Sequence, residues 1–307
     1  MALLPLQAFA FFSLLLLCAR LVYATPAVKQ DSHTSAPSGA VVVRVSGAAS
    51  GEYSTVQAAV DSLDDDGSDQ VIFIYAGTYT EQVYIDRDGQ TMIMGQTSDT
   101  SSYASNTDDF ALYNINVKNT FGKASTNGQA LALSAYGSNH GYYGMGFYGY
   151  QDMILAETGN QLYGYCYIKG AVDYIFGQYA WAYFHYNRIA SVAAGAITAN
   201  GRSSSDGVSL YVINKATITT SNSATSSIEG KVYLGRPWGA YARTGWEEWS
   251  SSTPNTDHVT FAEYASTGTG ASGTRASFST MLTSTSGYTI SDVLGSDYAD
   301  WVDSDYL

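Results

Sequence analysis

Residues 129 to 177 decide the fold, and they read QALALSAYGSNHGYYGMGFYGYQDMILAETGNQLYGYCYIKGAVDYIFG. Apolar positions in and just after this stretch recur at one constant interval, at Phe147, Ile168 and Ile189. A period in the low twenties is typical of a solenoid, in which each coil stacks on the one before it. Because no amphipathic helical pattern separates the neighbouring strand-like runs, the sequence predicts an all-β chain, a parallel β-helix.

Polar residues in the same stretch keep this step. Asp152 and Asp173 are separated by the same interval as the apolar positions, and Gln129 and Gln151 by one residue more. Adjacent strands of a sheet lie about 4.8 Å apart, so stacking would gather these four side chains into one column. The four residues are called the active-site column below.

Two carboxylates on adjacent coils cannot both ionise freely, so one of them keeps its proton to higher pH. Such a pair supplies an acid and a nucleophile, or an acid and a base. The carboxamides of Gln129 and Gln151 can donate hydrogen bonds to a developing oxyanion. Together these groups indicate acyl transfer at an ester. The alternative, a polar ladder that only joins coils, suits stacked Gln but not stacked Asp, because it places like charges side by side.

A second segment adds to this chemistry, the run YLGRPW at 233–238. Arg236 can pair bidentately with one of the two Asp residues and keep it ionised. Trp238 can stack on a sugar ring. Arg236 follows Asp173 by three times the repeat interval, nominally three coils, so the pairing requires long loops between the coils or a side chain that reaches back.

Composition limits the function of the 307-residue chain. It carries a net charge of −13, and its 14 Lys and Arg form no cluster, which disfavours nucleic-acid binding. The four His lack the spacing of metal ligands, and the sequence contains no phosphate-binding loop, so we expect no metal and no cofactor. We also expect a monomer. Of the two Cys, only Cys166 would remain after export, and we expect it to be buried in the repeat.

The chain divides into three parts by composition. Residues 1–24 have the apolar core and small-residue cleavage site of a secretory signal peptide, which predicts an extracellular protein without a membrane anchor. Residues 25–40 are polar and are expected to be flexible, and residues 41–307 are expected to form a single β-helix domain. A capping box, Ser54 to Gln57, predicts a short N-terminal helix to Leu63 that covers the open end of the solenoid.

Five blocks resemble, in order, the signature blocks of the pectin methylesterases: GTYTE at 77–81, QALAL at 129–133, GYQD at 149–152, VDYIFG at 172–177 and LGRPW at 234–238. The chain is most similar to the fungal branch. The resemblance implies a right-handed parallel β-helix that hydrolyses the methyl esters of pectin without a cofactor. It also implies roles for eight residues: Asp173 as nucleophile, Asp152 as general acid and then base, Gln129 and Gln151 as the oxyanion hole, Arg236 as the group that orients Asp173, and Trp238, Phe176 and Tyr174 as substrate contacts.

One departure from the family pattern follows Trp238. Tyr241-Ala242-Arg243-Thr244 runs almost directly into Gly245-Trp246, where the family continues through further strands. We therefore expect that most of one coil is missing, and this keeps open an alternative, a pectin-binding β-helix with impaired catalysis. A second alternative is a β-helix polygalacturonase or pectate lyase, against which the paired Gln and the Arg-Pro-Trp block argue.

Overall fold

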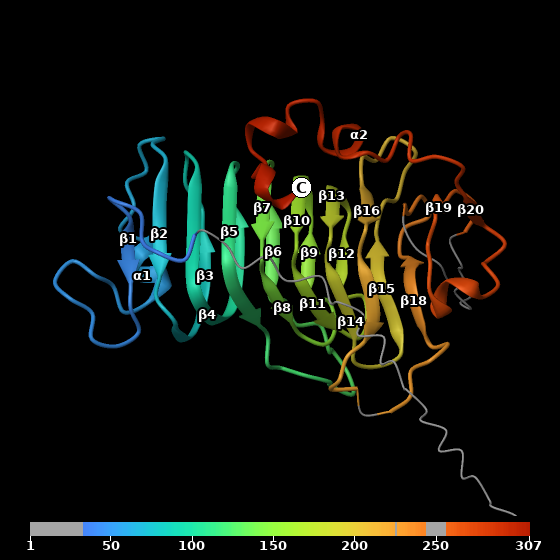
Figure 1. The fold of residues 1–307 in the computed structure, drawn as a ribbon, viewed down its shortest axis with the longest axis horizontal. Helices are drawn as coiled ribbons and strands as arrows, with labels where there is room; N and C mark the ends of the chain where they lie inside the picture. The colour runs from blue at the N-terminus through green and yellow to red at the C-terminus, as the bar shows by residue number, and fades with distance from the viewer. Residues whose placement is uncertain (1–32, 225, 244–255) are drawn as a thin grey trace, which may run out of the picture.

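The computed structural model describes residues 33–224, 226–243 and 256–307, and within them the chain winds into stacked coils (Figure 1). Each complete coil contributes one strand to each of three parallel sheets. The first sheet joins β1 (Val41–Val43), β2 (Gln70–Ile74), the start of β4 (Thr91–Asn106), the start of β5 (Phe110–Lys118), β7 (His140–Tyr143), β10 (Thr158–Gly164), β13 (Tyr179–His185) and β16 (Leu210–Asn214).

The other two sheets continue from the same coils. The second joins the start of β3 (Gly77–Ile85), the middle of β4, the end of β5, β8 (Gly146–Tyr148), β11 (Tyr167–Gly170), β14 (Arg188–Ser191) and β17 (Thr217–Thr220). The third joins the ends of β3 and β4 to β6 (Leu133–Tyr136), β9 (Ile154–Ala156), β12 (Ile175–Gly177), β15 (Gly195–Asn200) and β18 (Val232–Pro237). The predicted parallel β-helix is confirmed.

The sequence period is visible in the strand register. Phe147 pairs with Ile168, and Ile168 pairs with Ile189, on three successive coils. All three side chains are fully buried. The interior is therefore a set of stacked apolar rows, and each row buries side chains that one coil alone would leave in water.

The corners between the first and second sheets use left-handed backbone. Tyr165 and Tyr186 have φ values of 54° and 52°, and Lys215 has 53°. The chain turns at Tyr186, which separates β13 from β14. Asn187 fixes this corner, because its amide donates to the Tyr163 carbonyl at 2.9 Å and accepts from the Cys166 amide at 2.6 Å.

The N-terminal end is covered by helix α1 (Val56–Val60), as expected, but its cap differs from the prediction. Thr55, not Ser54, is the N-cap residue, and its hydroxyl accepts from the Ala58 amide. The carboxylate of Glu81 accepts from the amides of Val56 and Gln57, both at 2.9 Å. A carboxylate at these unpaired N–H groups also complements the helix dipole, so the helix is anchored on the next coil.

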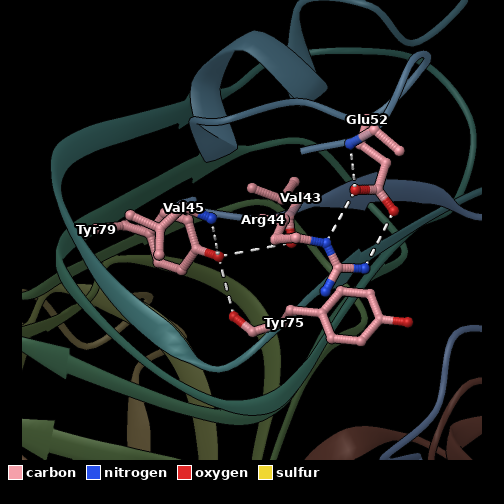
Figure 2. Close-up of polar contacts among 7 residues, drawn as sticks. Val43, Arg44, Val45, Glu52, Tyr75 and Tyr79 are labelled. Carbon is pink, nitrogen blue, oxygen red and sulfur yellow. Dashed lines mark hydrogen bonds and ion pairs between the residues drawn. The ribbon is translucent and has the colours of Figure 1, made fainter. Parts of the chain in front are cut away.

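An ion pair closes the same end, and Figure 2 shows it beside the ring of Tyr75. The Arg44 guanidinium donates to both carboxylate oxygens of Glu52, at 2.9 and 3.1 Å, and its central carbon lies 3.6 Å from the Tyr75 ring centroid. These bonds lower the pKa of Glu52 to about 2. The planar guanidinium thus joins the turn before α1 to the first full coil.

The C-terminal segment contains β19 (Phe261–Glu263), η1 (Thr269–Ser272), β20 (Ser279–Met281), α2 (Ile290–Leu294), η2 (Tyr298–Asp300) and η3 (Ser304–Tyr306). Its last part passes back over the middle of the first sheet (Figure 1, red). Tyr306 is fully buried with its ring 4.8 Å from that of Tyr143, and the Asn160 amide donates to the Leu294 carbonyl.

Part of the predicted flexible segment is also packed against this sheet. The ring of His33 stacks on Tyr113 with a centroid distance of 4.4 Å, and Ala36 and Ala40 are partly buried beside it. The predicted signal peptide, residues 1–24, lies outside the described residues. Cys166 is a free, buried thiol, and burial raises its pKa to about 12, so the predicted packing role is confirmed.

The buried rows generate a stability test. We predict that Ile168→Ala lowers the free energy of unfolding by about 2–5 kcal/mol, because it leaves a cavity between coils. Ile218 lies in the same row, paired with Ile189, but is 42% exposed. Ile218→Ala is the matched control, with an expected loss below about 1 kcal/mol. Urea unfolding measures both, and equal losses would contradict a core built from stacked rows.

Candidate active site

The active-site column forms where the chain turns from the second sheet into the third. Gln129 pairs with Gln151 as an isolated parallel bridge, and Gln151 pairs likewise with Val172. The amide of Asp152 donates to the Val172 carbonyl at 3.1 Å. These bonds fix the coils in register, so the four side chains predicted from the spacing come together at one place.

Both carboxylates stand on unusual backbone. Asp152 and Asp173 have φ values of 53° and 49°, in the left-handed region. Asp tolerates this region better than most residues, because its short side chain can bond locally. The amide of Asp173 donates to the Ala196 carbonyl of the next coil at 2.7 Å, which holds the turn in place. The repeat therefore places two carboxylates at equivalent corners of adjacent coils.

Arg236 binds Asp173 in the bidentate geometry that the sequence suggested. Its Nε donates to both carboxylate oxygens at 2.9 Å, and its Nη2 donates to Oδ2 at 2.6 Å. Asp173 is 6% exposed, so the pair is largely removed from water. A guanidinium in this position favours the ionised carboxylate and fixes the direction of its oxygens.

The wide separation of Asp173 and Arg236 in the sequence is explained by long loops. Phe176 pairs with Ala199, and Ala199 pairs with Arg236, so Arg236 lies two coils beyond Asp173, not three. The extra length is in the Ser-rich connections at 203–207 and 220–230. Two strand spacings of about 4.8 Å are within reach of an Arg side chain that extends back along the stack.

A cleft of about 230 Å³ opens over the column. Its lining consists of Gln129, Gln151, Asp152, Asp173, Phe176, Ala199, Arg236 and Trp238. All but one of the predicted site residues therefore meet in a single cleft. Trp238 is 41% exposed, and its ring lies 6.3 Å from that of Phe176 at a tilt of 55°, so the two aromatic side chains flank the carboxylates on one side.

Tyr174 is the exception, and its predicted contact with substrate is wrong. Its side chain is fully buried, and its hydroxyl is 2.9 Å from that of Ser191 in the interior. Side chains alternate along a strand, so Tyr174 and Phe176 could share a face only if the backbone between them were regular. The left-handed turn at Asp173 instead directs Tyr174 inward, over Gly170, where a Cβ atom would come within 2.4 Å of it.

The two carboxyl groups stand in different surroundings. Burial raises the pKa of Asp152 to about 6, the negative charge of Asp173 raises it as well, and Arg236 opposes both effects. Asp173 accepts three hydrogen bonds from Arg236. The cleft thus holds a carboxyl that is protonated in weak acid beside a carboxyl group that a guanidinium binds and orients.

Two positions were not found from the sequence. Ala199 lines the cleft, and Gly201 lies against the ring of Trp238. A Cβ atom on Gly201 would lie 2.6 Å from the indole ring, so only glycine lets the ring lie against this backbone. Both positions follow from the pairing of β12, β15 and β18, which the unequal lengths of the loops conceal in the sequence.

Within the described part of the chain, no three His, Cys, Asp or Glu side chains gather in a way that could hold a metal ion. The described helices are also too short and too polar for any of them to cross a membrane.

Comparison with known proteins gives consistent results. The sequence pattern of the pectinesterase family matches residues 41–293. A pectinesterase of Aspergillus aculeatus is 47% identical over 321 residues, which cover 90% of this chain and 95% of the relative. The crystal structure of an Aspergillus niger pectin methylesterase superposes with a TM-score of 0.80 at 32% identity, covering 90% of this chain and all of that one. A carrot pectin methylesterase gives 0.77 at 26% identity, covering 87% and 96%.

The alignment with the Aspergillus aculeatus relative also bears on the missing coil. It is 321 residues long, whereas 90% of 307 residues is about 276, so about 45 positions hold no residue of this chain. The chain is thus shortened, by more than the single coil we expected. The predicted position of the loss adjoins residues 244–255, which lie outside the described residues. The cleft and its ion pair are nevertheless complete, so the impaired alternative is not favoured.

The raised pKa of Asp152 predicts a pH-dependent gain in stability for Asp152→Asn. Its folded pKa, about 6, exceeds the ordinary value of 3.8, so the stabilisation from the bound proton is complete below 3.8 and is lost as pH rises through 6. Because Asn does not titrate, the free energy of unfolding of the variant, relative to wild type, should rise by about 1 kcal/mol between pH 4 and pH 8. This value allows for the partial solvation of Asp152. The exposed Asp206→Asn is the control. A difference that is constant with pH would contradict the assignment.

Proposed function

The chain belongs to the pectinesterase family, and from this membership we propose how its cleft removes methyl groups from pectin. The enzyme is a carboxylic ester hydrolase that converts methyl-esterified polygalacturonate to pectate and methanol. The observation that carries the proposal is the bidentate pair between Arg236 and Asp173 beneath two carboxamides. The pair supports an ionised, oriented nucleophile beside amide groups that can donate hydrogen bonds to a developing negative charge.

In the first step, an oxygen of Asp173 attacks the methyl-ester carbonyl of a galacturonosyl unit. The carbonyl oxygen gains negative charge, and the amide groups of Gln129 and Gln151 donate hydrogen bonds to it. The side-chain oxygen of Gln151, Oε1, lies over Gly128, where a Cβ atom would come within 2.7 Å of it. Glycine thus leaves room for this amide, and its NH₂ group is available to the oxyanion.

Asp152 then acts first as an acid. It gives its proton to the methoxyl oxygen as the bond between the carbonyl carbon and this oxygen breaks. Methanol leaves, and the acyl group stays attached to Asp173. Asp152, now ionised, takes a proton from water, which attacks the acyl carbonyl and frees Asp173. The product is freed as a carboxylic acid, which releases its proton to water and becomes the carboxylate, and Asp152 is protonated again. A pKa near 6 suits both roles in weakly acidic surroundings.

Substrate contacts follow from the exposed rings. We propose that Trp238 stacks on a sugar ring next to the reacting unit and that Phe176 packs against its apolar face. Both line the cleft, and Trp238 is one of the exposed large apolar residues in the described chain. Polygalacturonase chemistry needs two carboxylates free to flank a glycosidic bond, whereas here one of the two is bound bidentately by Arg236.

Export and association also belong to the proposal. The apolar core and cleavage site in residues 1–24 support secretion, which would bring the enzyme to pectin outside the cell. A single buried thiol, with its pKa raised to about 12, suits an oxidising compartment, because it forms no disulfide and reacts slowly. We propose that the mature chain, residues 25–307, acts as a monomer with residues 41–307 as one domain.

The nucleophile assignment predicts the effect of Asp173→Asn. Methanol release from highly methylated pectin should fall by at least about 10⁴-fold, because the attacking carboxylate is lost. Gln151→Leu should cost about 10²–10³-fold through the oxyanion. Reducing ends and unsaturated products are measured in the same assay, since their appearance without methanol would indicate a polygalacturonase or a lyase. Full methanol release by Asp173→Asn would refute the assignment.

A pH profile tests the acid. Methanol release, as kcat/KM, should decline as pH rises through about 6, where Asp152 loses its proton. The charge of Arg236 lowers the pKa of Asp152, so Arg236→Gln should move the decline in kcat/KM to higher pH. It should also reduce the rate. If kcat/KM of the variant declines at the same pH as that of the wild type, a group other than Asp152 titrates.

A further inference from the structure

Trp238 stands where the regular pairing of β15 with β18 stops. The register ends with Asn200 opposite Pro237, so Trp238 follows the last paired residue. Its ring lies against Gly201 and is 41% exposed. Strand pairing therefore fixes the residues before Trp238, whereas the residues after it depend on other contacts to hold the ring over the cleft.

Backbone contacts fasten the turn after Trp238 to the end of β15. The Gly239 amide donates to the Asn200 carbonyl, and the Tyr241 amide donates to the Arg202 carbonyl, both at 3.0 Å. A Cβ atom on Gly239 would lie 2.2 Å from the Arg202 carbonyl oxygen, so only glycine allows this close approach. The turn is thus laid directly on the backbone of the neighbouring coil.

The side chain of Arg202 adds a clamp to these bonds. Arg202 is only 5% exposed, and it lies under the same turn. Its guanidinium donates to the carbonyls of Ser205, Gly207 and Tyr241, the last at 3.0 Å. Its central carbon also lies 5.7 Å from the centroid of the Tyr241 ring. A planar group with five donors can join carbonyls on different segments, here the loop after β15 and the turn after β18.

The charge of Arg202 is not matched by a carboxylate. Among the described residues it forms no ion pair, and burial together with the charge of Arg243 lowers its pKa. A buried cation that is bound by carbonyl oxygens alone loses hydration without gaining the attraction of an opposite charge. What Arg202 contributes at this position is therefore the placement of three carbonyl groups, one of which belongs to the turn after Trp238.

We propose that Arg202 is a positioning residue for the reaction, which holds the turn after Trp238 and so keeps the indole ring against Gly201. The inference rests on the proposed function, in which Trp238 stacks on a sugar ring next to the reacting unit. Arg202 does not line the cleft, so it acts through this ring. Loss of the clamp should weaken binding of the polymer and leave the chemical step at Asp173 and Asp152 intact.

The test uses the mature enzyme and highly methylated pectin, which carries few charges. Arg202→Gln should raise the KM for methanol release about three- to tenfold, as for the loss of an aromatic contact, with kcat changed by less than about twofold. Trp238→Ala should also raise KM. In the Trp238→Ala background, Arg202→Gln should raise KM no further, because the ring through which it acts is absent. Arg202→Lys keeps a donor group and should recover part of the loss.

Gly239→Ala tests the same contact from the turn without removing the buried charge, and it replaces Arg202→Gln if that variant does not fold. It should raise KM only while Trp238 is present. A rise in KM of equal size with and without Trp238 would overturn the positioning role. A fall in kcat at unchanged KM would also overturn it, because a general loss of folded enzyme has this effect.

Arg243→Gln is the matched control. Arg243 lies on the same turn, but it contributes through its backbone amide, which donates to the Asn200 side chain at 3.1 Å and is kept in the variant. KM should therefore be unchanged. A rise equal to that of Arg202→Gln would overturn the clamp, because loss of positive charge alone would then explain both. Absence of methanol release by the wild type would instead overturn the proposed function itself.

Discussion

The ion pair between Asp173 and Arg236 is the interaction on which the site depends. It joins coils that are two strand spacings apart and buries a carboxylate that is 6% exposed. A charge so poorly hydrated is tolerated because three hydrogen bonds from one guanidinium replace water. Burial and the charge of Asp173 raise the pKa of the neighbouring Asp152, so this carboxyl keeps its proton in weak acid. Two chemically identical side chains thus have different surroundings, one bound by Arg236 and the other buried beside it.

The parallel β-helix makes this contact possible, since it turns sequence period into spatial coincidence. The row of Phe147, Ile168 and Ile189 holds the coils in register, and the left-handed corners at Asp152 and Asp173 set the direction of the carboxylates. Catalysis is therefore placed where the coils turn.

The sequence predicted the column well because its signal is local and periodic, and Gln129 through Asp173 keep one step. It predicted Arg236 beside Asp173 only as a possibility, since the Ser-rich loops have irregular lengths and conceal a spacing of two coils. Tyr174 was misplaced because the left-handed turn before it reverses the expected alternation. Gly201 was missed because its role, giving room to Trp238, is visible only once the strands are paired.

The central claim is that Asp173, held by Arg236, becomes acylated. Its most direct test is a single turnover of wild-type enzyme with a methylated galacturonate oligomer, stopped by acid at successive times and examined by mass spectrometry. The account predicts a transient adduct, equal to the oligomer minus methanol, on the peptide that contains Asp173, appearing together with one methanol per enzyme. Methanol release without carbohydrate on the enzyme at any time would show that water attacks the ester directly and would contradict the account.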